Sequence, residues 1–390
     1  MSEPAVPNLV VGPAPHIKAT DDVPEIMRAV AVALVPAFLF SLYRFGYWSW
    51  VVTLLAVAAA VGTEAAIQRF RGVRVTVNDW SAAVTGLLLA ATLPPNVAWY
   101  VPVAGSVIAI GIAKQCFGGL GCNIWNPALI GRAFLQIAFP AQISMSSWPW
   151  VTHPLADVRA PATTPSELQS GASAIHHAAT AAADAAASAA KTAVDVFTSA
   201  TPLQRLDQVT EGPDGMRMRV VGHTLDISWN EVLDAFLGNV NGSIAEVSAL
   251  ALILGGLYLL MRNIISWHIP AGYIGTVALL GWALPMPVHV HGSTFYTQWF
   301  TGPALFHVMA GGVMIGALFM ATDMVTSPMS RAGKLVFGIG CGLITILIRL
   351  YSGAYPEGVC YSILLMNTMV PMIDGFTRPR VFGKKTATGK

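Results

Sequence analysis

About ten apolar segments, separated by short polar ones, run along most of this chain. A membrane-spanning helix needs about 20 mostly apolar residues, and each segment meets or approaches that length. The expected spans are 26–43, 47–67, 80–93, 97–117, 124–139, 244–261, 264–284, 302–321, 335–348 and 359–373. The pattern predicts an all-α polytopic membrane protein with about ten transmembrane helices.

The spans form two groups of five that share a local motif. The third span contains GLLLAAT from Gly86 to Thr92, and the eighth contains GALFMAT from Gly316 to Thr322; each is followed by a proline-containing break. Pro94 and Pro95 lack backbone donors, and a membrane tolerates such a break only where protein or a cavity surrounds it. Because an odd number of spans inverts one half relative to the other, we expect two inverted five-helix repeats with broken helices.

A stretch of about a hundred residues between the fifth and sixth spans lacks the apolar pattern. It contains an Ala-rich run, 171–193, which favours either a helix or a simple tether. The chain therefore divides into a polar N-terminal segment (1–25), a first repeat (26–140), a segment with a hydroxyl-rich motif (141–243), a second repeat (244–374) and a tail (375–390).

Composition and charge support this interpretation. Of 390 residues, 54% are hydrophobic and only 11% are charged, far from the soluble balance of about 25% charged residues. A net charge of +2 does not indicate a nucleic-acid partner. Lys and Arg gather in the short loops on one side, which predicts that both termini are cytoplasmic and that segment 141–243 lies outside. That count places Lys114 on the inner side and Arg349 on the outer side.

The most distinctive polar motif runs from Asp195 to Leu203, DVFTSATPL. Pro202 disfavours helix at Thr201, which should therefore be extended and accessible to a modifying enzyme. An ordinary loop explains the same composition, since Ser, Thr, Ala and Pro are typical of loops.

A second motif, FGGLGCNIWNPA, places Gly118, Gly119 and Gly121 before the fifth span, with Asn123 and Asn126 among the residues that follow. Three glycines allow backbone to approach a planar ligand closely. The two amides share a helix face and either bind such a ligand or serve only to cap and pack the helix start.

Three acidic residues lie in or at the ends of spans. Glu64 lies within the second span, whereas Asp323 and Asp374 end the eighth and tenth. A charge inside a membrane costs about 2.5–3.5 kcal/mol on insertion scales, so such residues are candidates for an ion path, with an interfacial position as the alternative. Cysteines 116, 122, 341 and 360 show no metal-ligand spacing; Cys122 and Cys360 correspond between the halves and suit a shared iron–sulfur centre or buried packing.

The combination resembles the NqrB/RnfD family of flavin-carrying membrane subunits over nearly the whole chain. The resemblance is carried by 78–80 (NDW), 93–95 (LPP), 117–128 (FGGLGCNIWNPA), 321–323 (ATD), 357–359 (EGV), 365–367 (LMN) and the run Pro371-Met372-Ile373-Asp374. The short polar start with Pro15 and His16 is more similar to the RnfD branch than to NqrB. Departures from the family pattern are Ser199 in place of the usual Gly, the Ala-rich insertion, and Met324 in place of Pro.

The resemblance implies a subunit of an ion-translocating ferredoxin:NAD(+) oxidoreductase (Rnf) complex in the bacterial inner membrane, which relays electrons but has no catalytic residues or metal ligands of its own. It implies FMN joined to Thr201 through a phosphoester by a periplasmic flavin transferase, and riboflavin near Gly118, Gly119, Gly121, Asn123 and Asn126. The implied partners are membrane lipid, a second flavinylated subunit and iron–sulfur membrane subunits. Na⁺ or H⁺ would be transported. The alternatives are an NqrB-type subunit of a Na⁺-translocating NADH:quinone reductase and, in a different class, a small-solute channel or carrier.

Overall fold

A computed structural model describes residues 22–143, 219–221, 224–226, 229–240, 242–290, 293–351 and 358–377. Most of the N-terminal segment, Thr201 with its motif, the Ala-rich run and the C-terminal tail lie outside the described residues. Residues 22–143 are called the first half of the molecule, and residues 219–377 are called the second half.

The first half consists of helices joined by short loops. Its elements are α1 (Val23–Phe45), α2 (Tyr47–Phe70), η1 (Val77–Asp79), α3 (Ser81–Ala91), α4 (Tyr100–Ile108), the π-helical segment η2 (Ala109–Gln115), α5 (Pro127–Ala138) and α6 (Pro140–Ile143). α5 begins where sequence rules expect, because Pro127 occupies its first turn and the Asn126 side chain caps it.

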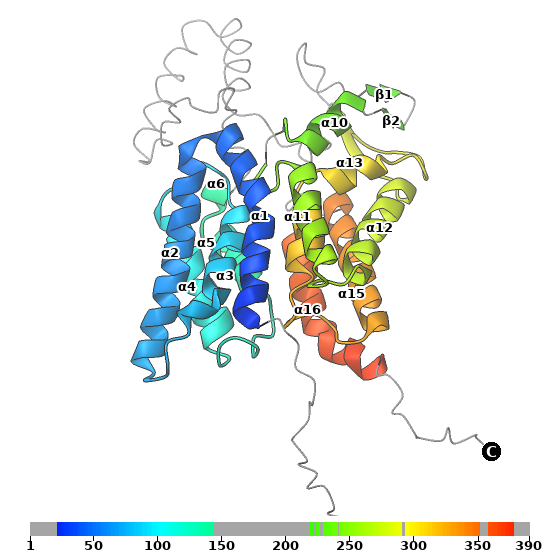
Figure 1. Cartoon of the computed structure of the whole chain (residues 1–390). Helices are drawn as coiled ribbons and strands as arrows, with labels where there is room; N and C mark the ends of the chain where they lie inside the picture. The colour runs from blue at the N-terminus through cyan, green and yellow to red at the C-terminus, as the bar shows by residue number, and fades with distance from the viewer. Residues whose placement is uncertain are drawn as a thin grey trace, which may run out of the picture.

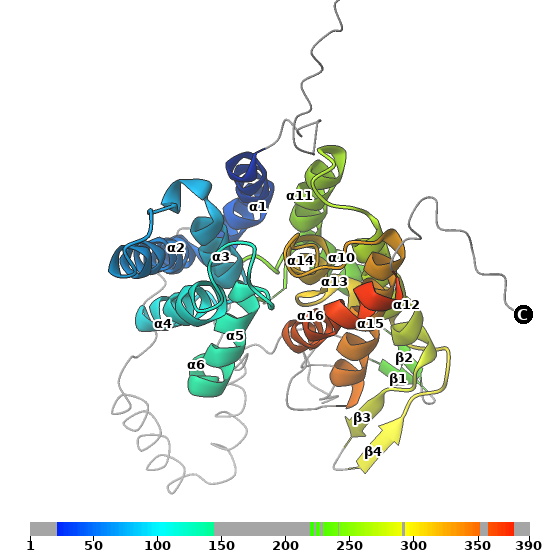
Figure 2. The same ribbon diagram turned by 90° about the horizontal axis from the view of Figure 1, so that it is seen from below.

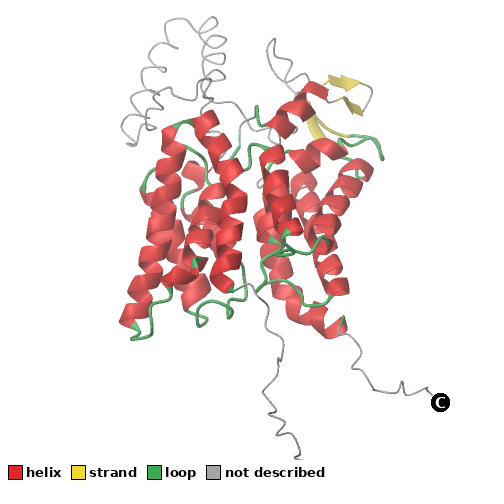
Figure 3. Ribbon diagram, viewed as in Figure 1, coloured by secondary structure: helices red, strands yellow, loops and turns green. Residues whose placement is uncertain are grey.

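The second half follows a similar course with more breaks. Its elements are β1 (Arg219–Val221), β2 (Thr224–Asp226), α10 (Trp229–Leu237), α11 (Ala249–Met261), α12 (His268–Ala283), β3 (Pro287–Val290), β4 (Ser293–Tyr296), α13 (Ala304–Met309), α14 (Val313–Ile315), the π-helical η4 (Gly316–Met320), α15 (Arg331–Tyr351) and α16 (Val359–Phe376). The strands form two antiparallel hairpins, β1–β2 and β3–β4, which the apolar pattern did not predict. They lie at the end of the molecule shown uppermost in Figure 3.

Four described helices, α1, α2, α15 and α16, are long and apolar enough to cross a membrane, and shorter apolar helices accompany them. This is the helix content of a membrane protein, as predicted. Each expected span contains helix, but the eighth is not one continuous helix. It divides into α13, α14 and η4, because the chain turns at Ala310-Gly311-Gly312, where Gly311 has a φ of 70°.

The break after α3 occurs at the prolines, and the second half satisfies its backbone. Ile244 N donates to Leu93 O at 2.9 Å, and Ala245 N donates to Ala91 O at 3.1 Å. Leu93 and Ala91 are fully buried. The broken helix end is therefore held by the other half, as the membrane interior requires.

The two halves stand side by side, with α1 against α11 and α5 against α16 (Figures 1 and 2). Gly255 on α11 has no room for a side chain, because a Cβ there would collide with the carbonyl oxygen of Ala33 on α1. Such close backbone contact at small residues is typical of helix packing in membranes. In Figure 1, α1 begins and α16 ends at the bottom of the molecule, while α6 and β1, which flank the undescribed central segment, lie at the top.

Two basic residues assigned to loops by the charge count are in fact buried. Lys114 is 2% exposed, and Arg349 is 7% exposed and donates to the carbonyl oxygens of His307 and Ala310. Lys114 lies in η2, within the expected fourth span, and Arg349 lies in α15, which continues past the apolar segment expected from sequence. Removing Lys114 from the inner side and Arg349 from the outer side still leaves most of the counted Lys and Arg residues on the inner side. The orientation predicted from the charge count is therefore unchanged.

Candidate functional site: a polar cavity between the halves

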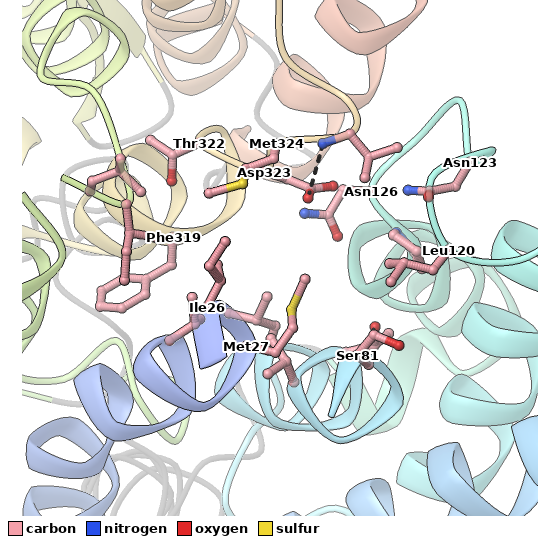
Figure 4. A pocket seen from close by; sticks show the side chains of 18 of the residues that line it. Ile26, Met27, Ser81, Leu120, Asn123, Asn126, Phe319, Thr322, Asp323 and Met324 are labelled. Carbon is pink, nitrogen blue, oxygen red and sulfur yellow. Dashed lines mark hydrogen bonds between the residues drawn. The ribbon is translucent and has the colours of Figure 1, made fainter. Parts of the chain in front are cut away.

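A cavity of about 90 Å³ lies between the two halves, near the start of α1. The first half lines it from α1, α3, η2 and the start of α5, and the second half lines it from the end of α11 and the segment after η4 (Figure 4). The polar lining residues are Ser81, Thr85, Lys114, Asn123, Asn126, Thr322 and Asp323. A mostly apolar cavity with a few convergent polar groups is the usual form of a binding site.

Asp323 lies directly beyond η4 and reaches this cavity. Its Oδ2 accepts a hydrogen bond from Thr326 Oγ1 at 3.1 Å, and its Oδ1 accepts from Val325 N at 3.5 Å. The preceding Thr322 is turned back on its own helix, because its Oγ1 donates to Leu318 O at 2.8 Å. The end of η4 thus brings a carboxylate to the boundary between the halves.

Asn126 joins the two halves. Its Oδ1 caps α5 by accepting from Ala128 N at 3.0 Å, and its Nδ2 donates to Met320 O of η4 at 3.2 Å. One residue earlier, Trp125 Nε1 donates to Thr368 Oγ1 of α16 at 2.9 Å. Asn126 therefore both caps α5 and packs against η4, which are the two structural roles that the sequence allowed.

Asn123 also lines the cavity, and its Nδ2 donates to Trp125 O at 3.3 Å. The three glycines before it have φ values of 119°, 101° and 90° at Gly118, Gly119 and Gly121. These backbone conformations strongly favour glycine, and at Gly121 nothing lies within 4 Å of the position a Cβ would take. The glycines shape the exposed loop beside the cavity and are not among the residues that line it.

Asp374 is separate from this site. It does not line the cavity, and its Oδ1 accepts from Met329 N at 3.1 Å. Asp323 and Asp374 therefore hold opposite ends of the same loop, but only Asp323 reaches the cavity. Thr92, the sequence counterpart of Thr322, is absent from the lining as well.

The sequence patterns missed the cationic member of the site. Lys114 is one of the residues that line the cavity, and its Nζ forms an ion pair with Glu64 Oε1 at 2.7 Å and a hydrogen bond with Ser81 Oγ at 2.6 Å. Glu64 was a candidate because of its position within a span. Lys114, about fifty residues further along, also lies within an expected span. A second charge inside a span was the feature of the sequence that could have indicated a partner for Glu64.

Among the residues that the structure describes, no group of three or more Cys, His, Asp or Glu side chains is placed to hold a metal ion. Cys116 and Cys122 are exposed, whereas Cys341 and Cys360 are buried. Cys360 Sγ donates to Leu129 O of α5 at 3.4 Å. Cys360 is therefore packed against α5, in agreement with the buried-packing alternative.

The cavity is smaller than a typical cofactor site. Small-molecule sites commonly enclose about 300–1,000 Å³, several times the volume found here. Both polar atoms of the Asn126 amide are also engaged by protein groups. The volume does suit ordered water or a small cation, since one water needs only roughly 10–15 Å³ of such space.

Known proteins are similar to this chain in sequence over nearly its full length. The model of the NQR2, RnfD, RnfE family matches residues 10–383. The chain belongs to this family. Among curated family members it is 40% identical to the D subunit of the Na(+)-translocating ferredoxin:NAD(+) oxidoreductase complex of Acetobacterium woodii, over 96% of both chains.

Two further family members are similar to the same degree. The D subunit of the proton-translocating ferredoxin:NAD(+) oxidoreductase complex of Clostridium ljungdahlii is 40% identical over 96% of each chain. The D subunit of the ion-translocating oxidoreductase complex of Stutzerimonas stutzeri is 40% identical over 94% of each. The predicted membership of the NqrB/RnfD family is confirmed, and these relatives bear the name of the D subunit.

Proposed function

We propose that this chain is the D subunit of an ion-translocating ferredoxin:NAD(+) oxidoreductase complex in a bacterial inner membrane. It would relay electrons and contribute to Na⁺ or H⁺ transport, and would not be catalytic by itself. The observation that carries the proposal is the polar cavity between the halves, in a chain that aligns end to end with relatives of that name. An NqrB-type subunit is the alternative within the family.

The arrangement of helices supports an inverted repeat as part of this proposal. α1 and α11 lie side by side and run in opposite directions, since α1 starts at the bottom of Figure 1 and α11 starts at the top. α5 and α16 form the corresponding pair at the end of each half. Inverted repeats place their sites at the interface between them, and this is where the cavity lies. We further propose cytoplasmic termini, which puts Asp323 near the cytoplasmic side and segment 141–243 in the periplasm.

Thr201 is our proposed attachment site for FMN, added by a periplasmic flavin transferase. The support is the DVFTSAT motif, in which Asp195 and Ser199 precede Thr201. The proposed riboflavin, associated with the Gly118–Asn126 segment, requires the cavity to open beyond its present volume. Flavins supply one-electron chemistry when bound, and the protein contributes position and electrostatic environment.

The proposal also includes partners. A relay subunit needs donors and acceptors, which we expect to be a second flavinylated subunit and iron–sulfur membrane subunits. Exposed apolar side chains on the long helices, such as Leu39, Leu54 and Leu347, suit contact with lipid or with such subunits.

Flavin attachment is the most direct test of the proposed function. Thr201→Ala should abolish in-gel flavin fluorescence and remove the mass of one FMN from the intact chain. Thr180→Ala is the matched control, because Thr180 also follows an alanine but lacks the upstream Asp. Fluorescence that persists in Thr201→Ala would refute the attachment site. A purified wild-type chain without flavin absorbance would instead favour a solute channel or carrier.

A further inference from the structure

The turn that follows α2 presents a basic and apolar surface that plays no part in the function proposed above. Residues 69–75 read RFRGVRV, and their three arginines are exposed. Phe70 is 94% exposed, and Val73 and Val75 are 48% and 45% exposed. These seven residues are called the arginine turn.

The arginine turn has a defined shape because polar side chains hold it in place. Gln68 Nε2 donates to Thr76 Oγ1 at 2.8 Å, and Thr76 N donates to Gln68 Oε1 at 2.9 Å. Arg71 Nη1 donates to Gln115 O of η2 at 3.1 Å. Phe70 therefore projects from an ordered segment, and its exposure is a feature of the fold.

The positive charge of the arginine turn is not neutralised by the described residues. No acidic residue lies within residues 69–75, and the nearest along the chain, Glu64 and Asp79, bond to other side chains. Within the described ranges, Arg69 and Arg74 form no ion pair and no side-chain hydrogen bond. Two guanidinium groups are thus available, and such groups bind phosphate oxygens through paired hydrogen bonds.

The length and position of α2 place this turn at the surface of the membrane. α2 has 24 residues and is about 36 Å long, whereas the hydrocarbon core is about 30 Å thick. Because Tyr47 begins α2 at one membrane surface, the last turn with Phe70 emerges among the lipid headgroups of the other. Figures 1 and 2 show α2 at the edge of the molecule, and Leu54 on α2 is 61% exposed. The arginine turn therefore meets lipid rather than the interface between the halves.

We propose that the arginine turn binds the phosphate group of an anionic phospholipid. Arg69 and Arg74 pair with the phosphate, and Phe70 enters the boundary between headgroups and acyl chains. An acidic protein surface would also complement the arginines, but the exposed apolar side chains beside them suit acyl chains. The binding requires neither electron transfer nor ion movement, so it is independent of the proposed function.

The test is binding of phosphatidylglycerol to the purified full-length chain in detergent micelles. Cys116 and Cys122 are exposed and are replaced by serine, and a Val73→Cys variant is labelled with an environment-sensitive dye. Phosphatidylglycerol should shift the dye emission to the blue with a saturable midpoint, whereas phosphatidylcholine should not. Arg69→Gln combined with Arg74→Gln should raise the midpoint lipid concentration at least about tenfold, because each basic residue near an anionic membrane surface contributes about fivefold. Phe70→Ser should also raise the midpoint, by about tenfold, because it removes a large apolar contact.

The control is Arg28→Gln combined with Arg331→Gln, which removes two exposed arginines that the charge count assigns to the same side. This control should leave the lipid midpoint unchanged. Equal midpoints for the two double variants, or an equal response to phosphatidylcholine, would overturn the proposal. A response to glycerol phosphate alone would do the same, because the turn would then bind free phosphate. Cross-linking of the Val73→Cys thiol to another subunit in the native complex would assign the turn to a protein partner instead.

Discussion

The close contact between α2 and α3 gives a sharp test of the packing that positions Glu64 and Ser81. A Cβ added at Gly86 on α3 would lie 2.8 Å from Val57 Cα and 3.0 Å from Ala56 O on α2. Both are backbone atoms, so a Gly86→Ala variant must push two helices apart. Overpacking of this kind costs about 1–3 kcal/mol.

The control is Gly62→Ala on α2, where nothing lies within 4 Å of the added carbon. Replacing glycine by alanine within a helix gains roughly 0.5–1 kcal/mol at either position. Because that gain is common to both variants, the difference between them isolates the packing cost. We expect Gly86→Ala to be less stable than Gly62→Ala by about 1–3 kcal/mol, or roughly 2–6 °C in thermal midpoint at about 2 °C per kcal/mol.

A thiol-reactive dye reports the unfolding, since Cys341 and Cys360 are buried in the second half. Cys116 and Cys122 are exposed and must first be replaced by serine. Equal midpoints for Gly86→Ala and Gly62→Ala would show that α2 and α3 separate at no cost. The contact would then not be what holds Glu64 near the start of α3.

Three further predictions concern the interface between the halves. Asn126→Leu should lower the amount of riboflavin extracted from the protein while covalently bound FMN is unchanged. If the variant and the wild type yield equal riboflavin, the role of Asn126 is limited to capping α5 and bonding to η4. Asp323→Asn should reduce cations moved per electron in vesicles, and Asp374→Asn should not, because only the former lines the cavity; equal effects would contradict a path through the cavity. Trp125→Phe removes the hydrogen bond to Thr368 and should cost about 0.5–1.5 kcal/mol, measured as a lower thermal midpoint.

Local properties of the chain were readable without a structure. Runs of apolar residues predicted where helices lie, because burial of apolar side chains in lipid depends on composition over about 20 residues. Pro94 and Pro95 predicted the break after α3, since proline cannot donate a backbone hydrogen bond. The cap at Asn126 followed from its place before Pro127. The motifs also identified the family, which the match to the family model confirms.

The sites depended on contacts that no local pattern contains. The charge count assigned Lys114 to the inner side, and only the packing of η2 against α2 reveals that it is the ion-pair partner of Glu64. Asp323 and Asp374 looked equivalent at the ends of two spans, yet the fold brings one to the cavity and uses the other to hold a loop. Hydropathy is a property of neighbours along the chain, so it locates the helices and, with the motifs, the family. The partner of a buried charge is chosen by which helices meet, so only the folded arrangement shows which polar residues share a site.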